Sequence, residues 1–228
     1  MIYFTGDTHG EEGRFSPEAM PGEYEFTEKD VLIVAGDFGY LFKGDATERI
    51  FLRYLEEKPY TIAFVDGNHE NFPLIYSYSR ETLWGGKIHR IGRNIVHLCR
   101  GQVYDIDGVK IFTMGGAYSI DRYMRTKGYS YWEEELPSHK EYREASENLD
   151  RVNMKVDVIV THTAPRTLIY EMGFTPDPHD AELTGFLDWI MHEVDYSHWF
   201  FGHFHIERDF DEKHHALFYS VRSIEGNV

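Results

Sequence analysis

The sequence contains five short apolar runs, and each run leads directly into side chains that can bind a metal ion. The runs cover residues 2–5, 31–35, 61–65, 156–161 and 198–201. Their length and the glycine or polar residues that bound them are typical of buried strands. The side chains of this kind are, run by run, Asp7 and His9 after the first, Asp37 after the second, Asn68 and His69 after the third, His162 after the fourth, and His203 and His205 after the fifth.

Amphipathic helical patterns lie between these runs. Residues 47–57 and 182–194 repeat apolar side chains every three or four positions, and residues 138–153 are expected to form a further helix after a loop. Strands that alternate with helices indicate a layered α/β fold, in which ligands gather at the carboxyl ends of the strands. The side chains that follow the five runs are therefore expected to share one site.

The middle and the end of the sequence predict additional strands. Residues 96–98, 103–106 and 110–114 have the pattern of a hairpin or meander that forms a second sheet, and residues 216–221 are expected to close the fold. No repeat, low-complexity tract or linker interrupts the sequence. Residues 1–228 are therefore predicted to form a single domain, since this length can bury one core.

Charge and cysteine content exclude several classes of protein. The net charge of −16 opposes binding along an extended nucleic acid, so a nuclease is disfavoured unless the charge is very uneven. The single cysteine, Cys99, excludes an internal disulfide framework and a cysteine-rich zinc site, and favours a cytoplasmic location. No apolar run is long enough for export or for a membrane span, so no membrane partner is expected.

The motifs differ in how much each one indicates by itself. Asp7-x-His9, Gly36-Asp37 and a lone His162 could each be an ordinary turn or a core residue. The tetrad at 67–70, Gly-Asn-His-Glu, is much rarer by composition. Mixed carboxylate, amide and imidazole ligands suit manganese, iron or zinc better than magnesium or calcium.

Taken in order, Asp-x-His, Gly-Asp, Gly-Asn-His-Glu, His and Gly-His-x-His resemble the calcineurin-like metallophosphoesterase superfamily over residues 6–205. The resemblance implies an α/β fold of four layers, an α/β/β/α sandwich in which two mixed β-sheets are flanked by helices. It also implies two divalent metal ions, manganese first and iron or zinc as alternatives. One ion would be held by Asp7, His9 and His205, the other by Asn68, His162 and His203, with Asp37 bridging both.

The implied reaction is two-metal hydrolysis of a phosphate monoester or diester by a metal-bridging hydroxide. His69 would contact the substrate and assist the leaving group, a contribution of typically about 10²–10⁴-fold. The protein Ser/Thr phosphatase branch carries an Asp-Arg pair after its bridging aspartate. Here Asp37 is followed by Phe-Gly-Tyr-Leu, which disfavours a dedicated protein phosphatase.

Substrate selection is assigned to a loop and helix insertion around residues 115–153. Arg122 and Arg125 could hold phosphate oxygens, and Tyr118 could stack on a base or another flat group. The competing interpretation is a surface loop whose arginines pair with the acids at 133–135, a run expected to be a solvated face. Small phosphoesters, nucleotides above all, are the expected substrates. A protein phosphatase, a metal-dependent nuclease and a catalytically silent phosphate-binding module are the alternatives, the last disfavoured because no expected ligand is missing.

Overall fold

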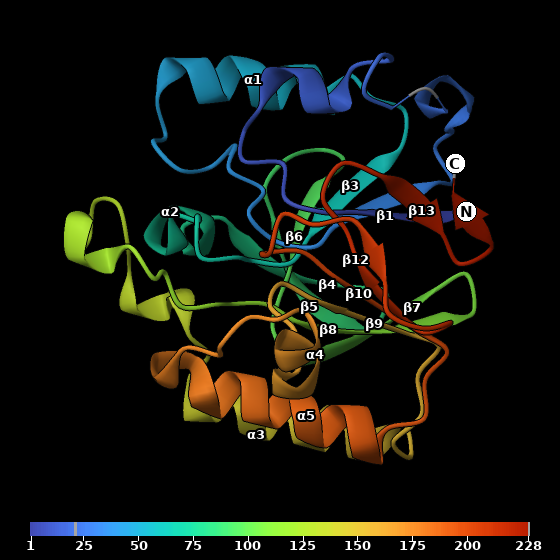
Figure 1. The fold of residues 1–228 in the computed structure, drawn as a ribbon. Helices are drawn as coiled ribbons and strands as arrows, with labels where there is room; N and C mark the ends of the chain where they lie inside the picture. The colour runs from blue at the N-terminus through green and yellow to red at the C-terminus, as the bar shows by residue number, and fades with distance from the viewer. Residues whose placement is uncertain (21, 228) are drawn as a thin grey trace.

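The computed structural model describes residues 1–20 and 22–227, and its elements form four layers (Figure 1). Helix α1 (Ala46–Glu56) covers the outside of one sheet. Helices α3 (His139–Arg151), α4 (Arg166–Glu171) and α5 (Ala181–Glu193) cover the outside of the other. The two sheets face each other between these outer layers. The predicted α/β/β/α sandwich is confirmed.

Both sheets are mixed. The first has the order β14-β13-β1-β2-β3-β6-β5-β4, and the second has the order β11-β12-β10-β9-β8-β7. Strands β1, β2, β3 and β6 are parallel, as are β8, β9, β10 and β12. The strands of the first sheet are β1 (Ile2–Thr5), β2 (Val31–Val34), β3 (Thr61–Phe64), β4 (Ser79–Leu83), β5 (Gly86–Arg90), β6 (Ile95–Leu98), β13 (Val221–Ser223) and β14 (Gly226–Asn227). Those of the second sheet are β7 (Gln102–Ile106), β8 (Val109–Met114), β9 (Val158–Thr161), β10 (His198–Phe201), β11 (Arg208–Asp209) and β12 (His214–Ala216).

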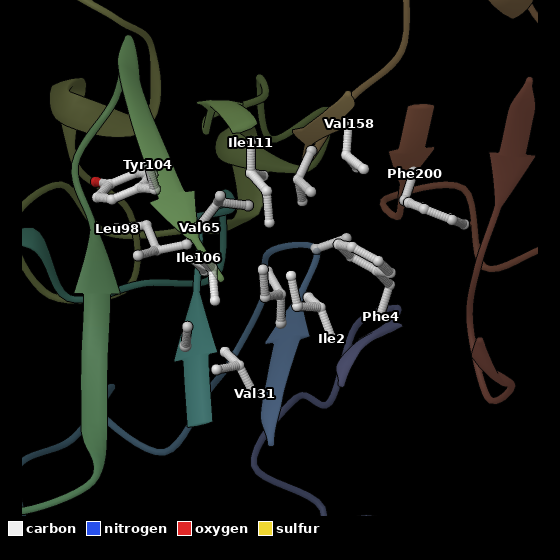
Figure 2. Packing of buried hydrophobic residues seen from close by; sticks show 14 of the residues in the cluster. Ile2, Phe4, Val31, Val65, Leu98, Tyr104, Ile106, Ile111, Val158 and Phe200 are labelled. Carbon is white, nitrogen blue, oxygen red and sulfur yellow. The ribbon is translucent and has the colours of Figure 1, made fainter. Parts of the chain in front are cut away.

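The central strands read as unbroken apolar runs because both of their faces are buried. Successive side chains of a strand point to opposite faces, so β2 sends Val31 and Ile33 toward the second sheet. Leu32 and Val34 pack in the layer beneath α1. Figure 2 shows the cluster between the sheets, where the ring of Phe4 stacks on Phe200 with centroids 4.2 Å apart.

Short elements complete the fold. Helix α2 (Phe72–Tyr76) follows β3, and 3-10 turns occur at Glu12–Phe15, Glu23–Glu25, Arg122–Met124, Glu133–Glu135 and Pro178–Asp180. Helix α3 begins at Ser138, whose hydroxyl and the Glu141 carboxylate cap each other's backbone in a capping box. Among the described residues, no helix is both long and apolar enough to cross a bilayer.

Two expectations about the sheets were wrong. Residues 96–98 lie in β6, which pairs with β3 in the first sheet, so only the β7–β8 hairpin joins the second. The expected closing strand at 216–221 is the connection between β12 and β13, which belong to different sheets. An apolar run specifies that a strand is buried, but distant packing decides which strand becomes its neighbour. The hairpin of β4 and β5 and helix α4 were not anticipated.

Candidate active site

The predicted metal ligands all lie just beyond the carboxyl ends of core strands. In the first sheet Asp7 and His9 follow β1, Asp37 follows β2 and Asn68 follows β3, whereas in the second sheet His162 follows β9 and His203 and His205 follow β10. Parallel strands present their carboxyl ends at one edge of a sheet. The two edges meet here, since the backbone N–H of His203 donates to the Asp7 carboxylate at 2.9 Å.

A first group of ligand atoms comes from Asp7, His9 and His205. The Nε2 atoms of the two imidazoles are 2.8 Å apart, and His205 Nε2 is 3.0 Å from Asp7 Oδ2. His9 Nε2 is 3.7 Å from the same oxygen. Three donor atoms from two sheets therefore converge on one point, as they do around a shared cation.

A second group is formed by Asn68 and His162, with the ring of His203 beside it. His162 Nδ1 donates to the Ala35 carbonyl at 2.9 Å, which leaves Nε2 as the ring nitrogen that can bind a metal ion. The Asn68 amide nitrogen donates to Ser119 Oγ, which leaves its carbonyl oxygen facing His162 Nε2 at 3.1 Å. Two acceptors at this distance repel each other, and a cation that both can bind removes the conflict. The donor set therefore fits a metal ion.

Asp37 lies between the two groups. Its Oδ1 is 3.4 Å from His162 Nε2, and its Oδ2 is 3.9 Å from His9 Nδ1. The backbone N–H of His69 also donates to Oδ1 at 2.7 Å and holds the carboxylate in this orientation. The geometry suits a carboxylate that spans two ions. The rings of His162 and His203 meet edge to face, with centroids 4.9 Å apart.

The backbone at this site is strained. His9, Asp37, His203 and His205 have positive φ angles of 48°, 47°, 67° and 52°. Such left-handed conformations cost non-glycine residues about 1–3 kcal/mol each and gather at functional sites. Since four candidate ligands share this conformation, their side chains are held in place at the expense of local backbone stability.

Each motif glycine makes room for a ligand that comes from a different motif. A Cβ on Gly36 would approach the His162 ring, one on Gly67 would approach Asp37 Oδ1, and one on Gly202 would approach Asp7 Oδ1. All three approaches are closer than 3.0 Å, which real Cβ atoms essentially never show. The glycines are therefore required by close approach across the two sheets.

Burial and local charge set the protonation of the site. Burial together with His162 lowers the pKa of His203 to about 4, which keeps the lone pair of one ring nitrogen available. Burial alone would raise the pKa of Asp37, but His162, His69 and His9 outweigh it and hold the pKa below its ordinary value. The hydrogen bond to Asp7 raises the pKa of His205. Asp37 is thus an anion among imidazoles.

Two supporting residues were missed by the sequence analysis. Ser119 orients the Asn68 amide, yet it lies 51 positions away and carries no local signal. Glu70, the last residue of the tetrad, is fully buried and accepts from the backbone N–H of Phe38 at 2.7 Å. Burial and Asp37 raise the pKa of Glu70 well above the ordinary value. Its hydrogen bond to Phe38 fixes the turn that carries Asp37.

The proposed catalytic residue, His69, lies beside one of the two predicted arginines. Arg125 Nη2 is 2.8 Å from His69 Nε2, and Arg125 Nε pairs with Asp121 Oδ1 at 2.7 Å. Burial, with a contribution from Arg125, lowers the pKa of His69. The structure therefore brings His69 and Arg125 together next to the ligand groups.

Arg122 is held differently. Its guanidinium pairs with Glu135 at 2.9 Å and lies over the ring of Tyr118 at 4.4 Å from the centroid. Glu135 is completely buried, so the expectation of a solvated acidic face at 133–135 was wrong for this residue. The guanidinium supplies the partner that a buried carboxylate needs.

A pocket of about 470 Å³, the Arg125 pocket, adjoins the ligand groups. It is lined by Asp37, Asn68, His69, His203 and His205 on one side and by Tyr118, Ile120, Arg125, Phe174, Phe204 and Asp180 on the other. The predicted substrate residues Tyr118 and Arg125 therefore reach it, whereas Arg122 is not part of its lining. A substrate in this pocket touches both the candidate metal centre and the segment around residues 115–153 that was predicted to select the substrate.

His89, His97 and Cys99 form a separate cluster of residue types that can bind metal ions, but its distances fit hydrogen bonds. The His89 and His97 Nδ1 atoms are 3.1 Å apart, and the rings are 17° from parallel with centroids 5.3 Å apart. These values point the two nitrogens straight at each other, as in one N–H···N bond. His97 Nε2 continues the chain to Asp66 at 3.0 Å. Burial raises the pKa of Cys99 to about 12, which suits a packed thiol.

The two facing sheets and the carboxylate, amide and imidazole groups at their meeting edges define a metal-dependent hydrolase. The family model for calcineurin-like phosphoesterases matches residues 1–207, and the chain belongs to this family. It is therefore a metal-dependent phosphoesterase. A family of this kind uses divalent ions, which agrees with the clusters of ligand atoms found here.

A similar solved structure is that of phosphopantetheinyl hydrolase from Mycobacterium tuberculosis. It shares 18% sequence identity with this chain at a TM-score of 0.51, and the match covers 96% of this chain and 89% of that one. At this identity the likeness shows the shared fold. The sequence matches no protein with a curated description.

Proposed function

We propose that this phosphoesterase hydrolyses small phosphate esters, with nucleotides as the most suitable class, at a centre of two divalent ions. The observation that carries the proposal is the placement of Asp37, whose two oxygens face His162 and His9 in separate ligand groups. A carboxylate in this position suits two neighbouring ions better than one. When bound, the ions supply a nucleophile that is active at neutral pH and positive charge at the reacting phosphate.

The proposed ligand sets follow the two groups of side chains. Asp7, His9 and His205 would hold one ion, Asn68, His162 and His203 the other, and Asp37 both. The mixture of nitrogen and oxygen donors favours manganese, with iron or zinc as alternatives. The position of His203 is supported by its contact with the His162 ring.

The substrate roles are assigned to residues that line the Arg125 pocket. Arg125 would bind non-bridging phosphate oxygens, and its planar guanidinium suits that contact. Tyr118 would support a flat group of the substrate. His69 would meet the leaving oxygen, because it lies between Arg125 and the ligand groups. Arg122 would act indirectly by holding Tyr118 and Glu135 in place.

The proposed setting is the cytoplasm, with a small phosphoester as the substrate. The support comes from the single thiol, Cys99, which is buried and free. The strongly negative net charge disfavours an extended nucleic acid as substrate.

The test is a substrate panel run with manganese and again with a chelator. It comprises an aryl phosphate, a bis-aryl phosphate, cyclic nucleotides and a phosphopeptide, and metal content is measured on the same samples. We expect about two ions per chain and turnover of the small esters that the chelator abolishes. Preferred turnover of the phosphopeptide, or one ion per chain at full activity, would contradict the proposal.

A further inference from the structure

A second pocket reaches the candidate metal centre from another side. This Lys43 pocket has a volume of about 270 Å³, and its lining includes His9, Phe42, Lys43, Thr47, Phe51 and His69. His69 also lines the Arg125 pocket. The two pockets therefore meet at the residue proposed to contact the reacting phosphate.

The pockets extend toward opposite outer layers of the fold. The Lys43 pocket is bounded by the first turns of α1, which covers the first sheet. The Arg125 pocket is bounded by Ile169 of α4 and by the segment that leads to α5, on the side of the second sheet. These helices lie on opposite faces of the sandwich (Figure 1). A group bound at the centre thus has room for one substituent in each direction.

The two pockets differ in chemistry. The wall of the Arg125 pocket is apolar at Ile169, Phe174 and Phe204, and the two phenyl rings stack with centroids 5.6 Å apart. Such a wall suits a flat or apolar substituent.

The Lys43 pocket is more polar. The carboxylate of Glu48 is already engaged by the backbone N–H groups of Lys43 and Gly44, and that of Asp45 accepts from the Glu48 backbone. The Lys43 side chain is exposed and forms no ion pair within the described part of the chain. Lys43 and Thr47 therefore offer hydrogen bonds to a polar substituent.

The charge around the Arg125 pocket also bears on the substrate. Arg122 is tied to Glu135, which leaves Arg125 as the guanidinium in the pocket lining. Besides Asp37, the carboxyl groups of Asp121, Asp177 and Asp180 line the same pocket, and Asp121 pairs with Arg125. Arg125 is thus the guanidinium in this lining that can donate to a phosphate oxygen.

We infer that the substrate is a phosphodiester, with an apolar or flat substituent in the Arg125 pocket and a polar substituent in the Lys43 pocket. The inference rests on the proposed function of the same site. A monoester has one substituent and fills one pocket, whereas a diester fills both.

The first test compares substrates that share a leaving group. They are p-nitrophenyl phosphate, bis(p-nitrophenyl) phosphate and the p-nitrophenyl ester of thymidine 5′-phosphate, each assayed with manganese. We expect kcat/KM for both diesters to exceed that of the monoester at least tenfold. An equal or higher value for the monoester would overturn the inference and leave the proposed function standing. No metal-dependent release from any substrate would overturn both.

The second test blocks the Lys43 pocket. Thr47→Trp places a large ring at its mouth, and Ile50→Trp is the matched control because Ile50 lies on the same helix, is 66% exposed and does not line the pocket. We expect the diester-to-monoester ratio of kcat/KM to fall at least tenfold in the first variant and to stay unchanged in the control. A ratio that is unchanged in Thr47→Trp, or that falls equally in both, overturns the inference.

Discussion

Arg125 Nη2 lies 2.8 Å from His69 Nε2. An arginine side chain can only donate, so His69 Nε2 accepts in this arrangement and the proton of the neutral ring is on Nδ1. Arg125, which is proposed to bind phosphate, thus holds His69, which is proposed to contact the leaving oxygen. If Arg125 turns to a bound phosphate, it gives up this contact and frees His69 Nε2, so we expect the two residues to act in sequence.

The first prediction separates His69 from the ligands. His69→Ala should keep both metal ions and lose about 10²–10⁴-fold in turnover on an alkyl ester, with a smaller loss on an aryl ester whose leaving group needs no proton. Asn68→Ala should instead lower metal content whatever the substrate. Metal stoichiometry and turnover on both esters check the pair. A His69→Ala protein with one ion, or with equal losses on both esters, would show that the residue is misplaced.

The second prediction separates the two arginines. Arg125→Ala should raise the KM of the preferred substrate about tenfold and leave the thermal midpoint of unfolding unchanged, because its side chain lines a pocket. Arg122→Ala should lower the free energy of unfolding by roughly 3 kcal/mol, since it leaves the buried Glu135 without its charged partner. Steady-state kinetics and urea unfolding of both variants test whether the two arginines differ in this way. Similar destabilisation by the two substitutions would refute the distinction.

The third prediction concerns the glycines that lie against ligands. In Gly67→Ala the new Cβ meets Asp37 Oδ1, so we expect loss of metal and at least a hundredfold loss of activity. Gly13→Ala is the matched control, because no atom lies within 4 Å of a Cβ at that position. Metal content and activity are measured for both proteins. Full metal content in Gly67→Ala would mean that the close approach is not required.

The fourth prediction is that metal binding stabilises the fold and depends on Asp37. An ion present at about a hundred times its Kd adds about 2.7 kcal/mol to the free energy of unfolding, so a chelator should lower the thermal midpoint. Asp37→Asn should abolish most metal-dependent turnover and most of this thermal shift, because a neutral amide bridges two cations poorly. Scanning calorimetry with and without manganese tests it, and a wild-type shift retained in the variant would argue against the bridge.

The fifth prediction concerns pH and Asp180. Burial, assisted by the charge of Asp177, raises the pKa of Asp180 to about 6. The folded chain then binds this proton more tightly than the unfolded chain, so its stabilising contribution is present at low pH and is lost as the pH rises through about 6. Asp180→Asn should flatten the fall in unfolding free energy between about pH 4 and pH 6.5. The free energy of unfolding is measured by urea titration at several pH values in that range. If the assignment is wrong, the wild-type protein and Asp180→Asn will show the same dependence on pH.

Much of the fold and the placement of the candidate ligands was predictable because both depend on local residue types. The run Val31–Val34 is short and rich in β-branched side chains, which favours a strand buried on both faces over a helix. Asp37, Asn68 and His162 had to emerge at strand ends, because the runs stop just before them. Carboxylate, amide and imidazole groups together then favour a metal site.

Tertiary structure alone decided what depends on contacts between distant residues. Strand β6 lies in the first sheet, and Ser119 accepts a hydrogen bond from Asn68. Arg122 pairs with Glu135, whereas Arg125 contacts His69. Nothing in the local sequence distinguishes two arginines three positions apart in one loop. Their roles follow from which one meets a buried carboxylate and which one faces a pocket, and those partners are brought near only when the two sheets pack together.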